Sequence, residues 1–173
     1  MKFEDIKTPE ELLKFLNETI KYGFVFNGKI FAEPISSGDM NFYKLKLGNA
    51  LINCGYGLCW DVVELERAFF EKAQIEHSSF FIETKAGPTH TFILFKQNNK
   101  VKWFEYTWQK YRGIHEEQTE QEALKDICSK HIQFHFGASK KTIEIYKYSK
   151  VTRALNATEF LKHCRSGEKI TMV

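Results

Sequence analysis

The sequence lacks a long apolar run and a concentration of positive charge, and we expect no secretory leader. No stretch approaches the ~18 apolar residues of a membrane span, and the N-terminus carries Glu4 and Asp5 with no uninterrupted apolar segment. We therefore expect no membrane segment and a place in the cytoplasm. The 25 basic and 22 acidic side chains give a formal net charge of +3, and the lysines are scattered. This balance argues against a nucleic-acid partner.

Metal-binding signals are also weak. The chain has no tight Cys-x2-Cys pair of the kind found in structural zinc sites. The two patterns that come nearest to a metal-ligand motif are Cys54-x4-Cys59 and Cys128-x2-His131-x3-His135. Both histidines of the second motif are expected on the solvated face of a strand over 132–136. We therefore expect no metal and no cofactor, and four cysteines that stay reduced.

The 173 residues contain no internal repeat, linker or low-complexity tract, so a single domain over 1–173 is expected. Hydrophobic residues make up 43% of the chain, which is enough for a sizeable core. The 16 Phe, 7 Tyr and 3 Trp indicate wide β surfaces with helices packed on them.

Helices are predicted where a capping signal precedes an apolar stripe. Thr8 and Glu11 form a capping box with Pro9 at the first helical position, and Asn156 and Glu159 form a second box that opens a helix to about Cys164. Further helices are predicted over about 40–50 (capped by Asp39), 60–74 and 118–129.

Strands are predicted over 79–84, 89–96, 101–107 and 142–148, with a shorter strand or buried loop over 24–31. The best hairpin joins 89–96 to 101–107 through Gln97-Asn98-Asn99-Lys100. Both faces of these two strands are apolar, so the sheet should be covered on both sides, or by a helix on one side and a large loop on the other. Together with the helices this predicts an α+β fold.

Cys59 follows a glycine-punctuated loop and begins a predicted helix. Backbone N–H groups and the helix dipole favour a thiolate at that position, as a nucleophilic cysteine requires. Alone, a buried cysteine is more often a small core residue. The catalytic interpretation therefore depends on partners for this thiol.

The hairpin supplies two such partners. If Gln97 pairs with Lys100, Phe92 faces Glu105, so His90 and Glu105 lie on one face as diagonal neighbours, ~7–8 Å apart at the backbone. His90 would then act as the base and acid for Cys59, and Glu105 would orient the imidazole. A backbone N–H of Cys59 or Trp60, and the side chain of Asn53, are the candidate oxyanion donors.

The strings Gly57-x-Cys59-Trp60-Asp61, His90-Thr91-Phe92 and Trp103-Phe104-Glu105 resemble the core of the transglutaminase-like superfamily, in particular its small bacterial-type single-domain members. The resemblance covers about residues 40–110 and does not extend to the α/β tail over about 115–173. It departs from the family pattern in placing Glu105 where aspartate is usual. It implies a papain-like core, in which a helix bearing the cysteine packs on an antiparallel sheet bearing the histidine and the acid.

Membership in this superfamily implies a cysteine-dependent acyl-transfer enzyme: a peptidase, amidase or deamidase that forms a thioester with a peptide or protein substrate. Some members of the superfamily lack activity. The alternative is therefore a catalytically silent papain-like module that binds a peptide or protein partner. Water and an amine both remain open as the acyl acceptor.

Overall fold

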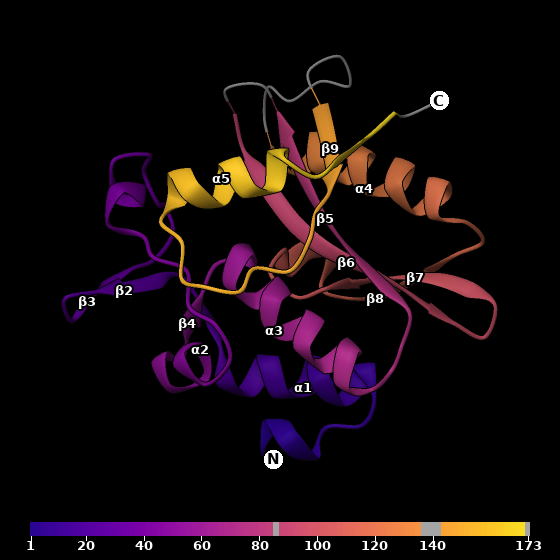
Figure 1. Cartoon of the computed structure of the whole chain (residues 1–173), viewed down its shortest axis with the longest axis horizontal. Coiled ribbons are helices and arrows are strands. Elements are labelled where there is room, and N and C mark those ends of the chain that lie inside the picture. The colour runs from indigo at the N-terminus through magenta and orange to yellow at the C-terminus, as the bar shows by residue number, and fades with distance from the viewer. Residues whose placement is uncertain (85–86, 136–142, 172–173) are drawn as a thin grey trace.

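A six-stranded antiparallel sheet forms the centre of the protein, in the strand order β10-β9-β5-β6-β7-β8 (Figure 1). The structure is a computed structural model and describes residues 1–84, 87–135 and 143–171. The strands of the central sheet are β5 (His77–Thr84), β6 (Thr89–Gln97), β7 (Lys100–Glu105), β8 (Gly113–Glu117), β9 (Ile143–Lys147) and β10 (Glu168–Ile170).

Two small sheets lie beside it. Strands β1 (Lys21–Tyr22) and β4 (Tyr56–Gly57) pair in parallel, and β2 (Phe24–Phe26) and β3 (Lys29–Phe31) form a hairpin. The hairpin turns at Asn27 and Gly28, which have φ angles of 47° and 77°. The sequence suggested a strand or a buried loop here, and the structure shows the hairpin.

The described residues form five α-helices and three short 3-10 helices. The α-helices are α1 (Pro9–Thr19), α2 (Asn49–Cys54), α3 (Cys59–Lys72), α4 (Glu120–Phe134) and α5 (Ala157–Arg165), and the 3-10 helices are η1 (Phe3–Asp5), η2 (Asp39–Phe42) and η3 (Gln109–Tyr111). The capping boxes predicted at the starts of α1 and α5 are both confirmed.

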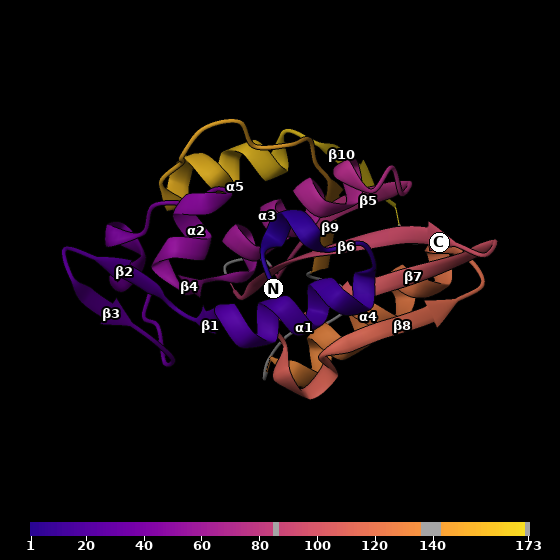
Figure 2. The ribbon, with the colours of Figure 1, turned by 90° about the horizontal axis from the view of Figure 1, so that it is seen from below.

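Helices cover both faces of the sheet, which confirms the α+β prediction (Figures 1 and 2). On one face, α1, α3 and α5 form a core with Phe81, Ile93 and Phe104. On the other face, α4 packs against Phe92 and Trp103 in a second core. Consecutive residues of a strand therefore enter different cores, which explains why β6 and β7 are apolar on both sides.

The β6–β7 register is the one predicted. Gln97 pairs with Lys100, and the pairing continues to Ile93 with Phe104. Asn98 and Asn99 form the turn with φ angles of 55° and 59°, a left-handed conformation that asparagine tolerates better than most residues. The turn therefore fixes which side chains of β6 and β7 share a face.

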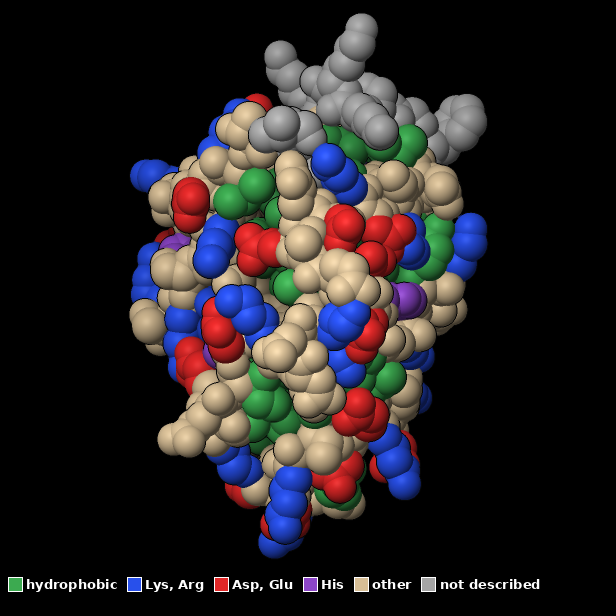
Figure 3. All heavy atoms as spheres, turned by 90° about the vertical axis from the view of Figure 1, so that its right-hand side faces the viewer, with side chains coloured by type: hydrophobic (Ala, Val, Ile, Leu, Met, Phe, Trp, Pro, Cys, Tyr) green, Lys and Arg blue, Asp and Glu red, His purple; other side chains and the backbone are tan. Residues whose placement is uncertain are grey.

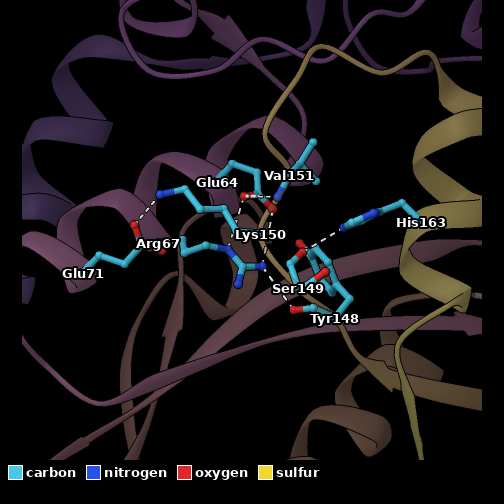
Figure 4. Close-up of polar contacts among 8 residues, drawn as sticks. All are labelled: Glu64, Arg67, Glu71, Tyr148, Ser149, Lys150, Val151 and His163. Carbon is cyan, nitrogen blue, oxygen red and sulfur yellow. Dashed lines mark hydrogen bonds and ion pairs between the residues drawn. The ribbon is translucent and has the colours of Figure 1, made fainter.

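Helix α3 is buried nearly all round, including residues that an amphipathic pattern would expose. Glu64 and Arg67 form a buried ion pair, with Nε 3.2 Å from Oε2 (Figure 4). The same two side chains hold the segment that crosses over the helix. Arg67 donates to the Tyr148 carbonyl at 3.4 Å, and Glu64 accepts from the Val151 N–H at 3.3 Å.

Two predicted elements are wrong. The helix expected over 40–50 is split into η2 and α2, because backbone N–H groups of the extended segment between them donate elsewhere: Leu45 to the Leu155 carbonyl and Lys46 to Asp61. The strand expected over 132–136 is instead the end of α4, which runs to Phe134. Its last position, residue 136, lies outside the described residues. Strand β8 was not predicted.

Helices long and apolar enough to cross a membrane are absent from the part of the chain that the structure describes. On the face shown in Figure 3, acidic and basic side chains are interspersed. This mixture agrees with the small net charge of the sequence.

Candidate active site

The Gly57-x-Cys59-Trp60-Asp61 string has a structural reason for each residue. A Cβ atom on Gly57 would lie 2.7 Å from Leu51 Cδ1, so only glycine fits without a shift. Asp61 is buried and accepts from the N–H groups of Leu58 (2.8 Å) and Lys46 (2.7 Å). Trp60 stacks on Phe160 of α5 at 4.7 Å. These contacts fix the N-terminus of α3, where Cys59 is the first residue.

His90 and Glu105 meet as the register predicted. His90 Nε2 lies 2.7 Å from Glu105 Oε2, and the two residues are 1% and 2% exposed. The pair comes from adjacent antiparallel strands on the face that contacts α4. A buried carboxylate needs such a partner, because an unpaired one would be costly.

The segment after β7 completes the environment of this pair. The second oxygen of Glu105 accepts from the Trp108 N–H at 2.8 Å and from the Thr107 hydroxyl at 3.2 Å. The Trp108 side chain stacks on the His90 ring, with centroids 3.9 Å apart and planes 13° from parallel. The imidazole is thus held at one edge by Glu105 and on one face by Trp108.

The Cys59 thiol is close enough to the His90 imidazole to help raise the pKa of that ring. Because Glu105 occupies Nε2, the ring nitrogen left for the thiol is Nδ1. Burial alone would favour a neutral His90. The Glu105 carboxylate, together with the hydrogen bonds to Cys59 and Glu105, outweighs burial and raises the pKa of His90 to about 10. The electrostatic environment therefore favours an imidazolium beside Cys59.

Two hollows meet at Cys59. The larger is a cleft of about 850 Å³ that runs past the N-termini of α3 and α5. The smaller, of about 110 Å³, extends past His90 and Trp108. Tyr22, Cys59 and Thr89 line both hollows. The side chains that line the larger cleft carry no formal charge, apart from any on Cys59 itself.

The two predicted oxyanion residues have different surroundings. Trp60 lines the larger cleft next to Cys59, at the helix start. Asn53 is exposed on α2 and borders neither hollow.

Tyr22, Thr107 and Trp108 line the site and were not predicted, because their proximity to Cys59 depends on segments distant in the sequence. Two of them, Thr107 and Trp108, follow Glu105 closely, which is the one signal that was available.

The two histidines of the Cys128-x2-His131-x3-His135 motif are not on the solvated face of a strand, as was predicted. His131 is buried on α4 and hydrogen-bonds with the Thr84 hydroxyl at 3.0 Å. His135, at the end of α4, lines the smaller hollow. Among the residues that the structure describes, no three His, Cys, Asp or Glu side chains are grouped to hold a metal ion. Cys54, Cys59 and Cys164 are free thiols.

Comparison of the chain with protein-family models and with curated protein sequences gives no match. The arrangement of Cys59, His90 and Glu105 is therefore the evidence that bears on a function.

Proposed function

We propose that the protein is a cysteine-dependent acyl-transfer enzyme of the transglutaminase-like, papain-like kind, with Cys59 as nucleophile, His90 as acid and base, and Glu105 as the orienting group. The observation that carries the proposal is the placement of His90 between the Cys59 thiol and the Glu105 carboxylate at the junction of two hollows. Nucleophile, base and orienting group in this order are the arrangement required for covalent catalysis.

The reaction would begin with attack of the Cys59 thiolate on an amide carbonyl in the larger cleft. The resulting oxyanion lies at the N-terminus of α3, where the unpaired backbone N–H groups and the helix dipole stabilise negative charge. His90 then protonates the leaving amine, and a thioester remains on Cys59. Attack on this thioester by water or an amine completes the transfer.

The larger cleft supports an uncharged stretch of peptide or protein as the acyl donor. Its walls combine apolar side chains with small hydroxyl groups, including Met40, Leu161 and Ser36. A thiolate nucleophile must stay reduced, so we propose that the enzyme acts in the cytoplasm.

Selective alkylation tests this proposal. Cys54 is more exposed than Cys59, so exposure alone predicts that Cys54 reacts first. If Cys59 is an activated thiolate, a low concentration of iodoacetamide at pH 6 should label Cys59 first, as measured by peptide mass spectrometry. His90→Gln should abolish the preference, and Cys54→Ala should leave it unchanged. Slow labelling with Cys54 ahead in the wild-type protein would favour the silent binding module instead.

A further inference from the structure

The smaller hollow contains a second histidine besides His90. His135 lines it together with Cys59 and His90. At about 110 Å³ the hollow has room for several water molecules. It shares Tyr22, Cys59 and Thr89 with the cleft that we assign to the acyl donor, and its other lining residues are different. The acyl acceptor can therefore occupy a space next to Cys59 that the acyl donor does not fill.

The ring of His135 is held in place while one of its nitrogens has no partner. It packs edge to face against His131 at 4.7 Å, against Phe134 at 4.9 Å and against Trp108 at 6.0 Å between centroids. Its Nε2 is buried and has no hydrogen-bond partner within residues 1–84, 87–135 and 143–171. A buried nitrogen without a partner is costly to a fold and calls for an explanation.

We propose that His135 is the base for the second half of the reaction: it takes a proton from the acceptor nucleophile that attacks the thioester on Cys59. This inference rests on the proposed function. It divides the two proton transfers between two histidines. His90 serves the acyl-donor half, and His135 serves the acceptor half.

The charges around the two rings support this division. Glu105 favours the protonated form of His90, so in the acyl-enzyme His90 regains a proton from solvent and then has no free nitrogen to take one from the acceptor. Burial, and then the positive charge on His90, lower the pKa of His135, which keeps it neutral. The other titratable groups at the hollow or against the ring are Glu33, Tyr22 and His131. Opposite pKa shifts in one site are the usual mark of a separate acid and base.

Water is the simplest acceptor for this step. The water oxygen bonds to the thioester carbon while its proton moves to the free nitrogen of His135. The carbon–sulfur bond then breaks, and sulfur leaves as a thiolate stabilised by His90, which has taken a proton from solvent to replace the one it gave to the leaving amine. His135 releases its proton to solvent, and the acid product departs. No oxidant, reductant or metal ion takes part in this step.

Burst kinetics with p-nitrophenyl acetate separate the two halves of the reaction. Release of p-nitrophenolate reports acylation, and loss of the acetyl group from Cys59, followed by intact mass, reports deacylation. His135→Gln should leave the burst rate within about twofold and slow deacylation by about 100-fold. His135→Phe keeps an aromatic ring against Trp108 and should show the same loss. The half-buried His163, which donates to the Ser149 carbonyl far from Cys59 in the sequence, provides the matched control His163→Gln.

Added imidazole distinguishes a base from a packing residue. Imidazole should restore deacylation in His135→Ala, because it can enter the vacated space and accept the proton. Three results would overturn the inference. These are unchanged deacylation in His135→Gln and His135→Phe, an equal loss of acylation and deacylation in those variants, or no rescue of His135→Ala by imidazole. If the wild-type protein never acquires an acetyl group on Cys59, the proposed function itself fails, and the inference falls with it.

Discussion

Glu105 uses both of its carboxylate oxygens. One faces His90 at 2.7 Å, and the other accepts from the Trp108 N–H and the Thr107 hydroxyl. Glutamate stands here where the resembled family usually has aspartate. Its additional methylene lets the carboxylate contact the imidazole and the segment after β7 together. The residue thus orients His90 and positions Trp108, which covers the same ring.

Glu105→Gln is expected to lower the acylation rate roughly 100-fold or more, because the amide cannot stabilise an imidazolium and can favour the wrong tautomer. Glu105→Asp keeps the charge but shortens the side chain, so its loss should be smaller. Burst kinetics measure both rates. An acylation rate in Glu105→Gln equal to that of the wild type would exclude an orienting role for Glu105.

At the scale of elements, Asp61 links two segments of backbone. It caps α3 by accepting from Leu58, and it fixes the extended stretch between η2 and α2 by accepting from Lys46. Burial raises the pKa of Asp61 to about 6, although both backbone hydrogen bonds oppose this shift. The residue therefore explains both the start of α3 and the absence of the helix predicted over 40–50.

Asp61→Ala should lower the free energy of unfolding by about 2–4 kcal/mol, because two buried N–H groups lose their acceptor. Asp61→Asn retains one acceptor oxygen and should cost less. Urea unfolding followed by far-UV circular dichroism measures the change. A loss below about 0.5 kcal/mol in Asp61→Ala would mean that other groups or water satisfy these donors.

The Glu64–Arg67 pair is the second internal link of α3, because it attaches the segment over 148–151 to the helix (Figure 4). Burial raises the pKa of Glu64, and Arg67 opposes that shift. A charge in this position depends on its partner, since removing one member of a buried pair leaves the other without compensation.

Arg67→Met should therefore destabilise the protein by about 3–5 kcal/mol. The double variant Glu64→Gln/Arg67→Met should lose less than Arg67→Met alone, because no charge is then left unpaired. A double-mutant cycle from urea midpoints measures the coupling. Additive losses would show that the two side chains act independently.

At the scale of the whole molecule, the sheet separates two cores, and His131 lies in contact with the one beneath α4. Its side chain is fully buried and bonds to Thr84. Burial, with smaller contributions from His135 and His90, lowers the pKa of His131 to about 3. In the unfolded chain the pKa returns to about 6.5. Between these values the unfolded chain binds more protons than the folded protein.

The free energy of unfolding should consequently fall as the pH drops from 6.5 towards 3, at up to about 1.4 kcal/mol per pH unit from this residue. His131→Gln removes the titrating group, so its stability should depend less on pH over 6.5 to 4.5, above the range where most carboxylates titrate. Urea unfolding at several pH values measures both slopes. Equal slopes would show that His131 is not the group responsible.

Features that depend on near neighbours along the chain could be predicted from the amino-acid sequence. Capping boxes fixed the starts of α1 and α5, because their partners lie three residues apart. The Asn98-Asn99 turn fixed the β6–β7 register, which brought His90 and Glu105 to one face. Apolar side chains on both faces of the two strands predicted that other segments cover the sheet. Each of these interactions forms within a helical turn or a hairpin, so spacing alone was sufficient.

Features that depend on contacts between distant segments became known from the folded structure. The extension of α4 to Phe134 follows from burial of His131 against the sheet, although residues 132–136 alternate like a strand. Glu64 and Arg67 of α3 are buried where residues 148–151 cross the helix and bond to both side chains. Likewise, the presence of Cys59, His90 and His135 around one hollow requires the packing of α3 and α4 around the sheet. Spacing along the chain carries no information about such contacts.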